Sequence, residues 1–510
     1  MNKIFTLLKY TIYFFILLTF IKASFSYTGS KFVYTLFSII SIFHLFFALR
    51  KDSYFVDKFV AIFIWLGFWF KFSFEFSYQL WGEINFREGI GLFDKSSESY
   101  DNVLILASIG IIAFIIASFL SKFIFSIHKV ELISFKNLFF NKYKKYIYLV
   151  FIFIVVTVSS LNIKYGIYQK GLIPNENISI FISYIFRWLL LFGFTSFACI
   201  LIFFELNNKI IDHKYLFIVF LESFISNLSL MSRSVIFNYM SFIYGIFVYF
   251  KKINIKKYFF YFIIIFSFIL FFINIFFVNE LRNLKYYKNS SYNFEKIFNY
   301  NLNKSYKNDY LVANFSSLDI KNFNIFQIQN KLQNNIFQDI GYLLLNRWVG
   351  IDALMAVSAQ ESNLGFDLIK ESLDEKFVEN EYSLFEKKFL LRKNKEITNE
   401  NLLKSNSIIL PGLVAYLYFS GSKIFVCISI ILLMFLCYLL ERLIYLFSDK
   451  NLILTAFMGY IFASRLAHSG YLVSNNLNYL FAIIINLIAI YVVMLIFKKL
   501  NQYFINNCKS

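Results

Sequence analysis

The chain has 510 residues, of which 59% are hydrophobic and only 16% are charged. Soluble domains average about 45–50% apolar and about 25% charged residues, so this composition excludes a soluble enzyme and indicates a protein dissolved in lipid. The formal net charge is +19, but the Lys and Arg residues gather in short loops between apolar runs. Positive charge placed in this way is a signal of membrane topology, and we therefore expect no nucleic-acid partner.

Twelve apolar runs are long enough to cross a membrane or nearly so. A spanning helix needs about 20 largely apolar residues. The first run can also be read as a cleaved signal peptide, and we favour a retained span. The sequence therefore predicts an all-α polytopic membrane protein with about twelve transmembrane helices, near residues 4–24, 32–49, 58–79, 102–125, 146–163, 178–205, 215–230, 234–250, 258–279, 423–440, 452–466 and 478–497.

The basic loops set the orientation. Loops 50–58, 126–145 and 251–257 and the C-terminal tail are rich in Lys and Arg, and twelve spans place them on one side together with the N-terminus. Cytoplasmic loops carry such an excess, so we expect both termini to be cytoplasmic. Loop 80–101, on the opposite side, is acidic.

The chain divides into three parts. Residues 1–279 form a first transmembrane bundle of about nine helices, residues 280–407 form one large extracytoplasmic loop, and residues 408–510 hold the last three spans. Within the loop, apolar residues at helical spacing predict helices over 338–360, 366–378 and 383–393. The piece 408–420 starts with a Pro-Gly pair and ends in Ser-Gly-Ser, which indicates a re-entrant or interfacial segment.

Several common catalytic motifs are absent from the sequence. It has no Walker-type phosphate loop, no HExxH, no CxxC and no Asp-x-Asp pair, and its four cysteines lack metal-ligand spacing. We therefore expect no metal and no cofactor. The cytoplasmic loops are too short for a catalytic domain, so any chemistry should lie at the membrane or outside it, on a substrate carried by a lipid.

Arginines near the expected outer boundary are the most informative residues. Arg233 lies in a tight turn between two spans, Arg347 in the loop, Arg465 at the outer end of a span and Arg187 within the sixth span. An intramembrane charge costs about 2.5–3.5 kcal/mol on insertion scales. Because guanidinium pairs bidentately with phosphate oxygens, we expect a phosphate-binding cluster. The alternatives are snorkelling, or pairing with a carboxylate such as Glu222, which could also orient Arg233.

Three further residues bear on chemistry and packing. His468 alone among the four histidines is expected at the outer surface, three residues after Arg465, a spacing that places both on one helical face. A neutral imidazole there could take a proton from a sugar hydroxyl, or it could be a solvated loop residue. Lys71 and Glu75 are four apart in the third span, which predicts a structural ion pair.

Three short stretches carry a resemblance to a known family. They are Ser232-Arg233-Ser234, Asn346-Arg347-Trp348-Val349-Gly350-Ile351-Asp352, and Ser464-Arg465 with His468. With these stretches, the many spans and the large late loop, the chain resembles the Wzy-type O-antigen polymerases, the oligosaccharide repeat-unit polymerases of bacterial envelopes. The likeness is one of overall pattern over nearly the whole chain.

The resemblance implies a GT-C-like fold in the inner membrane, with the large loop in the periplasm. It implies a glycosyltransferase that joins repeat units carried on undecaprenyl pyrophosphate, which serves as donor and acceptor, and it implies a chain-length regulator as a protein partner. The catalytic residues would be Arg233, Arg465 and His468, the last as possible base. The substrate-binding residues would be Arg347, Arg187, Glu222 and Trp348.

Two other functions stay open. A lipid-linked oligosaccharide flippase or polysaccharide exporter would also need basic residues, but through the whole membrane depth, where these spans are sparse in charge. An O-antigen ligase or another lipid-dependent glycosyltransferase would use the same chemistry on a different acceptor.

Overall fold

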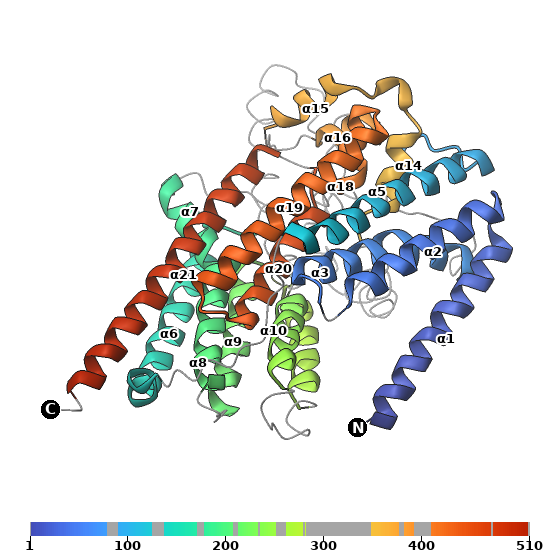
Figure 1. Ribbon diagram of the computed structural model, residues 1–510. Coiled ribbons are helices and arrows are strands. Elements are labelled where there is room, and N and C mark those ends of the chain that lie inside the picture. The colour runs from blue at the N-terminus through green and yellow to red at the C-terminus, as the bar shows by residue number, and fades with distance from the viewer. Residues whose placement is uncertain are drawn as a thin grey trace, which may run out of the picture.

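The computed structural model describes residues 2–50, 52–78, 90–124, 137–170, 178–207, 213–232, 235–250, 262–278, 281, 348–376, 382–391, 410–470 and 473–507. Every regular element in these ranges is a helix, and none is a strand (Figure 1). The predicted all-α class is therefore confirmed for the described part of the chain.

The helices of the first half follow the apolar runs of the sequence. Two spans contain a π-helical turn, named η1 and η2. In chain order the elements are α1 (Asn2–Ser26), α2 (Lys31–Ala48), α3 (Phe55–Ile64), η1 (Trp65–Phe70), α4 (Lys71–Tyr78), α5 (Ser97–Ile124), α6 (Leu138–Tyr165), α7 (Ile180–Trp188), η2 (Leu189–Gly193), α8 (Phe194–Asn207), α9 (His213–Ser229), α10 (Val235–Phe250) and a helix over Phe262–Val278.

The second half begins with short helices and ends with long ones. These elements are α14 (Ile351–Ser358), the 3₁₀ turn η5 (Glu361–Asn363), α15 (Phe366–Leu373), α16 (Leu384–Lys388), α18 (Leu413–Leu417), the 3₁₀ turn η6 (Tyr418–Ser420), α19 (Lys423–Phe447), α20 (Leu452–Ala467) and α21 (Val473–Asn507).

Each of the twelve predicted spans coincides with a described helix. Seven helical stretches are long and apolar enough to cross a membrane, namely Lys31–Ala48, Phe55–Ser77, Ser97–Ile124, Leu138–Tyr165, Phe181–Leu206, Lys423–Phe447 and Tyr479–Asn506. The other five coincide with shorter apolar helices of 10–17 residues. The protein is thus a helical membrane protein, while twelve spans and a GT-C-like arrangement remain predictions.

Helix α20 is the centre of the bundle. It packs against α3, α10 and α19, and its residues from Leu452 to Ala463 are all buried. Figure 1 shows α1, α2, α3 and α5 on one side of this centre and α6, α8, α9 and α21 on the other. A central helix that is apolar all round is expected to be enclosed by other helices.

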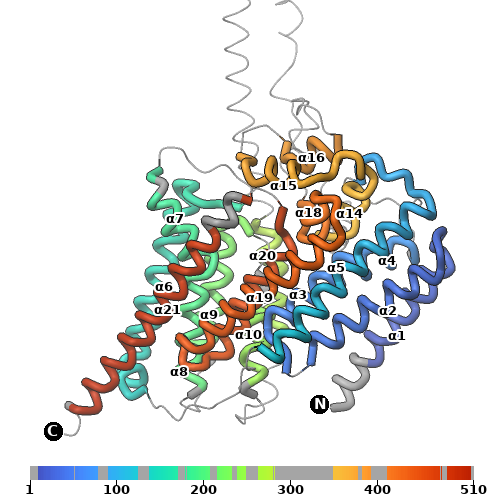
Figure 2. Tube along the Cα trace, turned by 45° about the horizontal axis from the view of Figure 1, so that its top comes forward, coloured from blue at the N-terminus to red at the C-terminus, as the bar shows by residue number. Residues whose placement is uncertain are grey.

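The short helices form a cap at one end of the bundle. Figure 2 shows α14, α15, α16 and α18 gathered there, and the N-terminal end of α1 and the C-terminal end of α21 lie at the other end in Figure 1. This arrangement agrees with the predicted separation of the termini from the large loop. Which end faces the cytoplasm remains a prediction.

The cap contains the described parts of the predicted loop helices. Helix α14 falls within the predicted 338–360, of which residues before 348 lie outside the described residues, while α15 and α16 fall within 366–378 and 383–393. The broken segment predicted over 408–420 is the buried pair α18–η6, closed by Gly421 with φ 71°. Glycine adopts this left-handed conformation without steric cost.

A buried ion pair fastens the cap to the membrane bundle. Lys71 bonds to Asp352 of α14, rather than to Glu75, the partner that the spacing predicts. Lys71 and Glu75 both lie in the regular helix α4, so their spacing is as predicted, but the spacing could not reveal the competing carboxylate on α14. Next to the pair, a Cβ on Gly67 would lie 2.2 Å from the Val349 carbonyl oxygen, so only glycine allows this close approach.

A second buried contact joins the N-terminal end of α3 to α19. The Glu441 carboxylate of α19 accepts hydrogen bonds from the backbone N–H groups of Phe55 and Val56, both 2.9 Å long. These donors belong to the first turn of α3, which has no intrahelical acceptors for them. Negative charge at a helix N-terminus is stabilising, so Glu441 holds α3 in register with α19.

Candidate functional site

Two of the predicted arginines meet near the cap end of the bundle. The Arg187 guanidinium, in the last turn of α7, lies 5.3 Å from the centre of the Tyr168 ring. The Arg465 guanidinium, in the last turn of α20, lies 4.9 Å from the Tyr479 ring centre on α21. Arg187 lies within electrostatic range of Arg465 and of Tyr479, so positive charge accumulates at this place. The aromatic faces partly stabilise the two guanidinium groups, and a bound anion would offset this charge.

Local backbone structure brings Arg187 to this place. The π-helical turn η2 follows Trp188 directly, and such turns are frequent at functional sites. A Cβ on Gly193 would lie 3.2 Å from the Trp188 carbonyl oxygen, so a small residue fits at the end of this wider turn. The buried Nε of Arg187 has no hydrogen-bond partner among the described residues. It therefore keeps a donor that an anionic ligand could use.

Asn162 joins the loop after α6 to the end of α9. Its Nδ2 donates to the carbonyl oxygens of Tyr168, at 2.9 Å, and Ser229, at 3.0 Å, while its Oδ1 accepts from the Tyr168 N–H at 2.8 Å. The Lys170 N–H donates to the Leu230 carbonyl at 2.9 Å. The loop that carries Tyr168 is thus fixed to the turn that leads to Arg233.

That turn is closed and strained. Met231 has a φ of 51°, and the Ser232 N–H donates to the Asn227 carbonyl oxygen at 2.8 Å, which makes a Schellman-type helix end. A left-handed non-glycine residue costs roughly 1–2 kcal/mol, and such strain is concentrated at functional sites. The Lys170 ammonium donates to Ser232 Oγ at 3.3 Å, adding a cation beside the turn. Arg233 itself lies outside the described residues, as does Arg347.

His468 and Trp348 lie in a second group, around Phe63 of α3. The His468 ring centre is 5.9 Å from that of Phe63, and the Trp348 ring centre is 6.2 Å from it. His468 Nδ1 lies 2.8 Å from the Ser464 carbonyl oxygen. A carbonyl can only accept, so we assign the proton to Nδ1, which leaves the lone pair of a neutral ring on Nε2. The structure therefore brings two of the three family-like stretches together.

The prediction that Arg465 and His468 share one helical face is wrong. Arg465 contacts Tyr479 on α21, whereas His468 contacts Phe63 on α3. His468 is the residue after the last turn of α20, with φ −104° and ψ 29°, so its side chain leaves the helical register. The end of α20 thus stands between the arginine pair and the histidine.

Glu222 lies in the helical core. It has no exposed surface, and it accepts hydrogen bonds from Ser226 Oγ at 2.9 Å and Thr195 Oγ1 at 3.4 Å. A fully enclosed carboxyl influences the site only through the helices that it joins, here α8 and α9. This placement does not support the predicted contact between Glu222 and the substrate.

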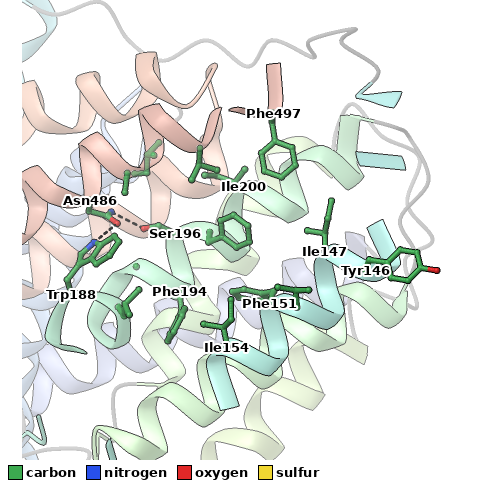
Figure 3. Close-up of a pocket in the computed structure, with 17 residues that line it drawn as sticks. Tyr146, Ile147, Phe151, Ile154, Trp188, Phe194, Ser196, Ile200, Asn486 and Phe497 are labelled. Carbon is green, nitrogen blue, oxygen red and sulfur yellow. Dashed lines mark hydrogen bonds between the residues drawn. The ribbon is translucent and has the colours of Figure 1, made fainter. Parts of the chain in front are cut away.

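An apolar pocket of about 550 Å³ lies along α21, beyond the ring of Tyr479 on which Arg465 stacks. It lies between α6, η2–α8 and α21, and Trp188, the neighbour of Arg187, is part of its wall. Inside it, Trp188 Nε1 donates to Asn486 Oδ1 at 3.2 Å, and Asn486 Nδ2 donates to Ser196 Oγ at 3.0 Å (Figure 3). Sequence reasoning missed this pocket because its lining consists of ordinary apolar span residues. The signals that could have indicated it are Gly193 and the mid-span Asn486.

In the described part of the chain, no three His, Cys, Asp or Glu side chains gather into a group that could hold a metal ion.

Comparison of the sequence and structure with protein-family models, curated proteins and solved structures finds no match. The case for function therefore depends on the geometry of the arginine pair, the histidine group and the apolar pocket.

Proposed function

We propose that the protein is a glycosyltransferase that polymerises oligosaccharide repeat units carried on undecaprenyl pyrophosphate at the outer face of the bacterial inner membrane. The observation that carries this proposal is that two arginines, each over a tyrosine ring, lie near each other within a membrane bundle that also holds an apolar pocket. Paired guanidinium groups suit a phosphate or pyrophosphate, and the apolar surroundings suit a ligand that arrives in a lipid.

In the proposed reaction, a hydroxyl oxygen of the acceptor glycan attacks the anomeric carbon of the donor glycan. The new glycosidic bond forms while the bond from that carbon to the pyrophosphate oxygen breaks. Arg187 and Arg465 stabilise the negative charge that develops on the departing lipid pyrophosphate, which is electrostatic catalysis. The substrate extends across the end of α20, from the arginines on one side to the histidine on the other, and the hydroxyl proton moves to Nε2 of His468, whose Nδ1–H is held by the Ser464 carbonyl.

The cap serves as a cover that holds both glycans near the end of α20. Asp352 anchors α14 to Lys71, and Trp348 stands beside the histidine group, where an aromatic ring can stack on a sugar. Restricting two reactants in this way lowers the entropic part of the barrier. The proposal includes cytoplasmic termini, a periplasmic cap and a chain-length regulator as protein partner.

The test is the length of lipid-linked glycan in cells that lack the protein and carry wild type, Arg187→Ala or Arg465→Ala at equal expression. We expect the deletion to leave single repeat units and both variants to fail to restore long chains. Arg442→Ala is the matched control, since Arg442 also lies on a span and stacks on a tyrosine, Tyr445 at 5.5 Å, but on α19 away from the pair. Long chains in cells carrying Arg187→Ala or Arg465→Ala would contradict the proposal.

The same experiment separates the two other functions. A flippase or exporter would leave unmodified repeat units on the cytoplasmic leaflet of the deletion strain. A ligase would leave long lipid-linked chains that are not transferred to their final acceptor. Either pattern would replace polymerisation as the assigned function.

A further inference from the structure

The apolar pocket is a slot that extends along α21 and begins at Asn486, seven residues and about 10 Å of helix from Tyr479, on which Arg465 stacks. Trp188 and Asn486 mark its end near the pair, and Phe497 lies eleven residues beyond Asn486 on the same helix. At 1.5 Å per residue, this places the two ends of the slot roughly 16 Å apart. The slot therefore lies in the part of the bundle that would be in the hydrocarbon core, and the two arginines lie beyond its Trp188–Asn486 end.

The slot is open on one side. Tyr146, Val150 and Ile154 of α6 line it and are 67%, 53% and 44% exposed. The opposite wall is closed by buried residues of η2–α8 and α21, among them Phe194 and Ile490. An apolar chain could thus enter sideways from the bilayer between α6 and α21.

We propose that this slot binds the polyprenyl chain of a phosphorylated lipid whose phosphate or pyrophosphate lies on Arg187 and Arg465. Covering the apolar walls of the slot removes them from contact with disordered lipid and fixes the carrier relative to the arginines. The charge at one end and the uniformly apolar walls beyond it match a ligand with one anionic head and a long apolar tail. This inference depends on the lipid-linked substrate of the proposed function.

Asn486 fixes the boundary between the two halves of the site. It accepts from the indole of Trp188 and donates to Ser196 Oγ and, at 3.6 Å, to Met458 Sδ of α20. Its polar atoms are thus bonded to the protein, so they do not compete for the tail. The indole that Asn486 orients belongs to the residue next to Arg187, which couples the tail slot to the headgroup.

The experiment uses the full chain in detergent and a radiolabelled polyprenyl phosphate with a diazirine near the tail end. We expect photolabelling of peptides from α6, α8 or α21. Ala489→Phe places a ring in the slot and should weaken probe binding about tenfold, since it displaces several tail carbons. Ile488→Phe is the matched control, because Ile488 is the neighbouring residue, is 58% exposed and does not line the slot.

The headgroup and the tail are tested separately. Arg187→Ala should weaken binding of the polyprenyl phosphate but not of the uncharged polyprenol, whereas Ala489→Phe should weaken both. Labelling confined to other helices, or an unchanged affinity in Ala489→Phe, overturns the inference. Equal competition by a diacyl phosphatidic acid also overturns it, because the slot would then be a general lipid site.

Failure of the tail slot and failure of the proposed function give different results. If the probe binds as expected but cells lacking the protein still make long glycans, the binding slot is supported and polymerisation is rejected as the function. If long glycans are lost in the deletion but the probe does not occupy the slot, polymerisation stands and the slot is rejected.

Discussion

Breaking the ion pair between Lys71 and Asp352 should detach the cap. Lys71 is 3% exposed, and Asp352 is 7% exposed. Removing one partner of a buried pair leaves an uncompensated charge and typically costs about 3–5 kcal/mol, whereas replacing both by apolar residues is often close to neutral. We therefore expect Asp352→Asn and Lys71→Met each to destabilise the protein by several kcal/mol.

The double variant Lys71→Met/Asp352→Leu should be more stable than either single variant. The assay is thermal unfolding in detergent, together with the rate of proteolysis within the cap. The pair Lys388–Glu371 is the control, since its side chains are 45% and 50% exposed and such pairs contribute about 0–1 kcal/mol. If the double variant is as unstable as the sum of the two single changes, the pair is not the anchor of the cap.

The remaining predictions concern packing and catalysis. Gly67→Ala should loosen the cap, because its Cβ would lie 2.2 Å from the Val349 oxygen, while Gly365→Ala meets open space; equal proteolysis of the two variants would contradict this. Glu441→Ala leaves two buried N–H groups without an acceptor, which should lower the free energy of unfolding by about 1–3 kcal/mol for each group. A lowered melting temperature would show this loss. His468→Gln should slow polymerisation by about 10²–10⁴-fold with an unchanged melting temperature, and a near-normal rate would remove the histidine as base.

Much of the fold could be predicted from local sequence. The apolar runs gave helices at every expected position because a spanning helix depends on about 20 consecutive residues and little else. Pro411-Gly412 and Gly421 correctly indicated the broken segment before α19. Contacts between distant residues were not accessible in this way. Lys71 bonds to a residue 281 positions away, and no periodicity in a single sequence can indicate such a partner.

The candidate site was predictable in part. An arginine inside an apolar run is conspicuous, so Arg187 and Arg465 could be singled out before the structure placed them together. The π-helical turns could not be foreseen, because no spacing pattern in the sequence indicates them. The helical-face argument failed for His468 for a different reason, because His468 follows the end of its helix.

The most direct test of the account is synthesis by the purified protein in proteoliposomes that contain an undecaprenyl-pyrophosphate-linked repeat unit and no nucleotide. The account predicts lipid-linked glycans of two and more units together with released undecaprenyl pyrophosphate, and loss of both products in Arg465→Ala. Movement of the repeat unit between leaflets without a new glycosidic bond would contradict the account and identify a transporter.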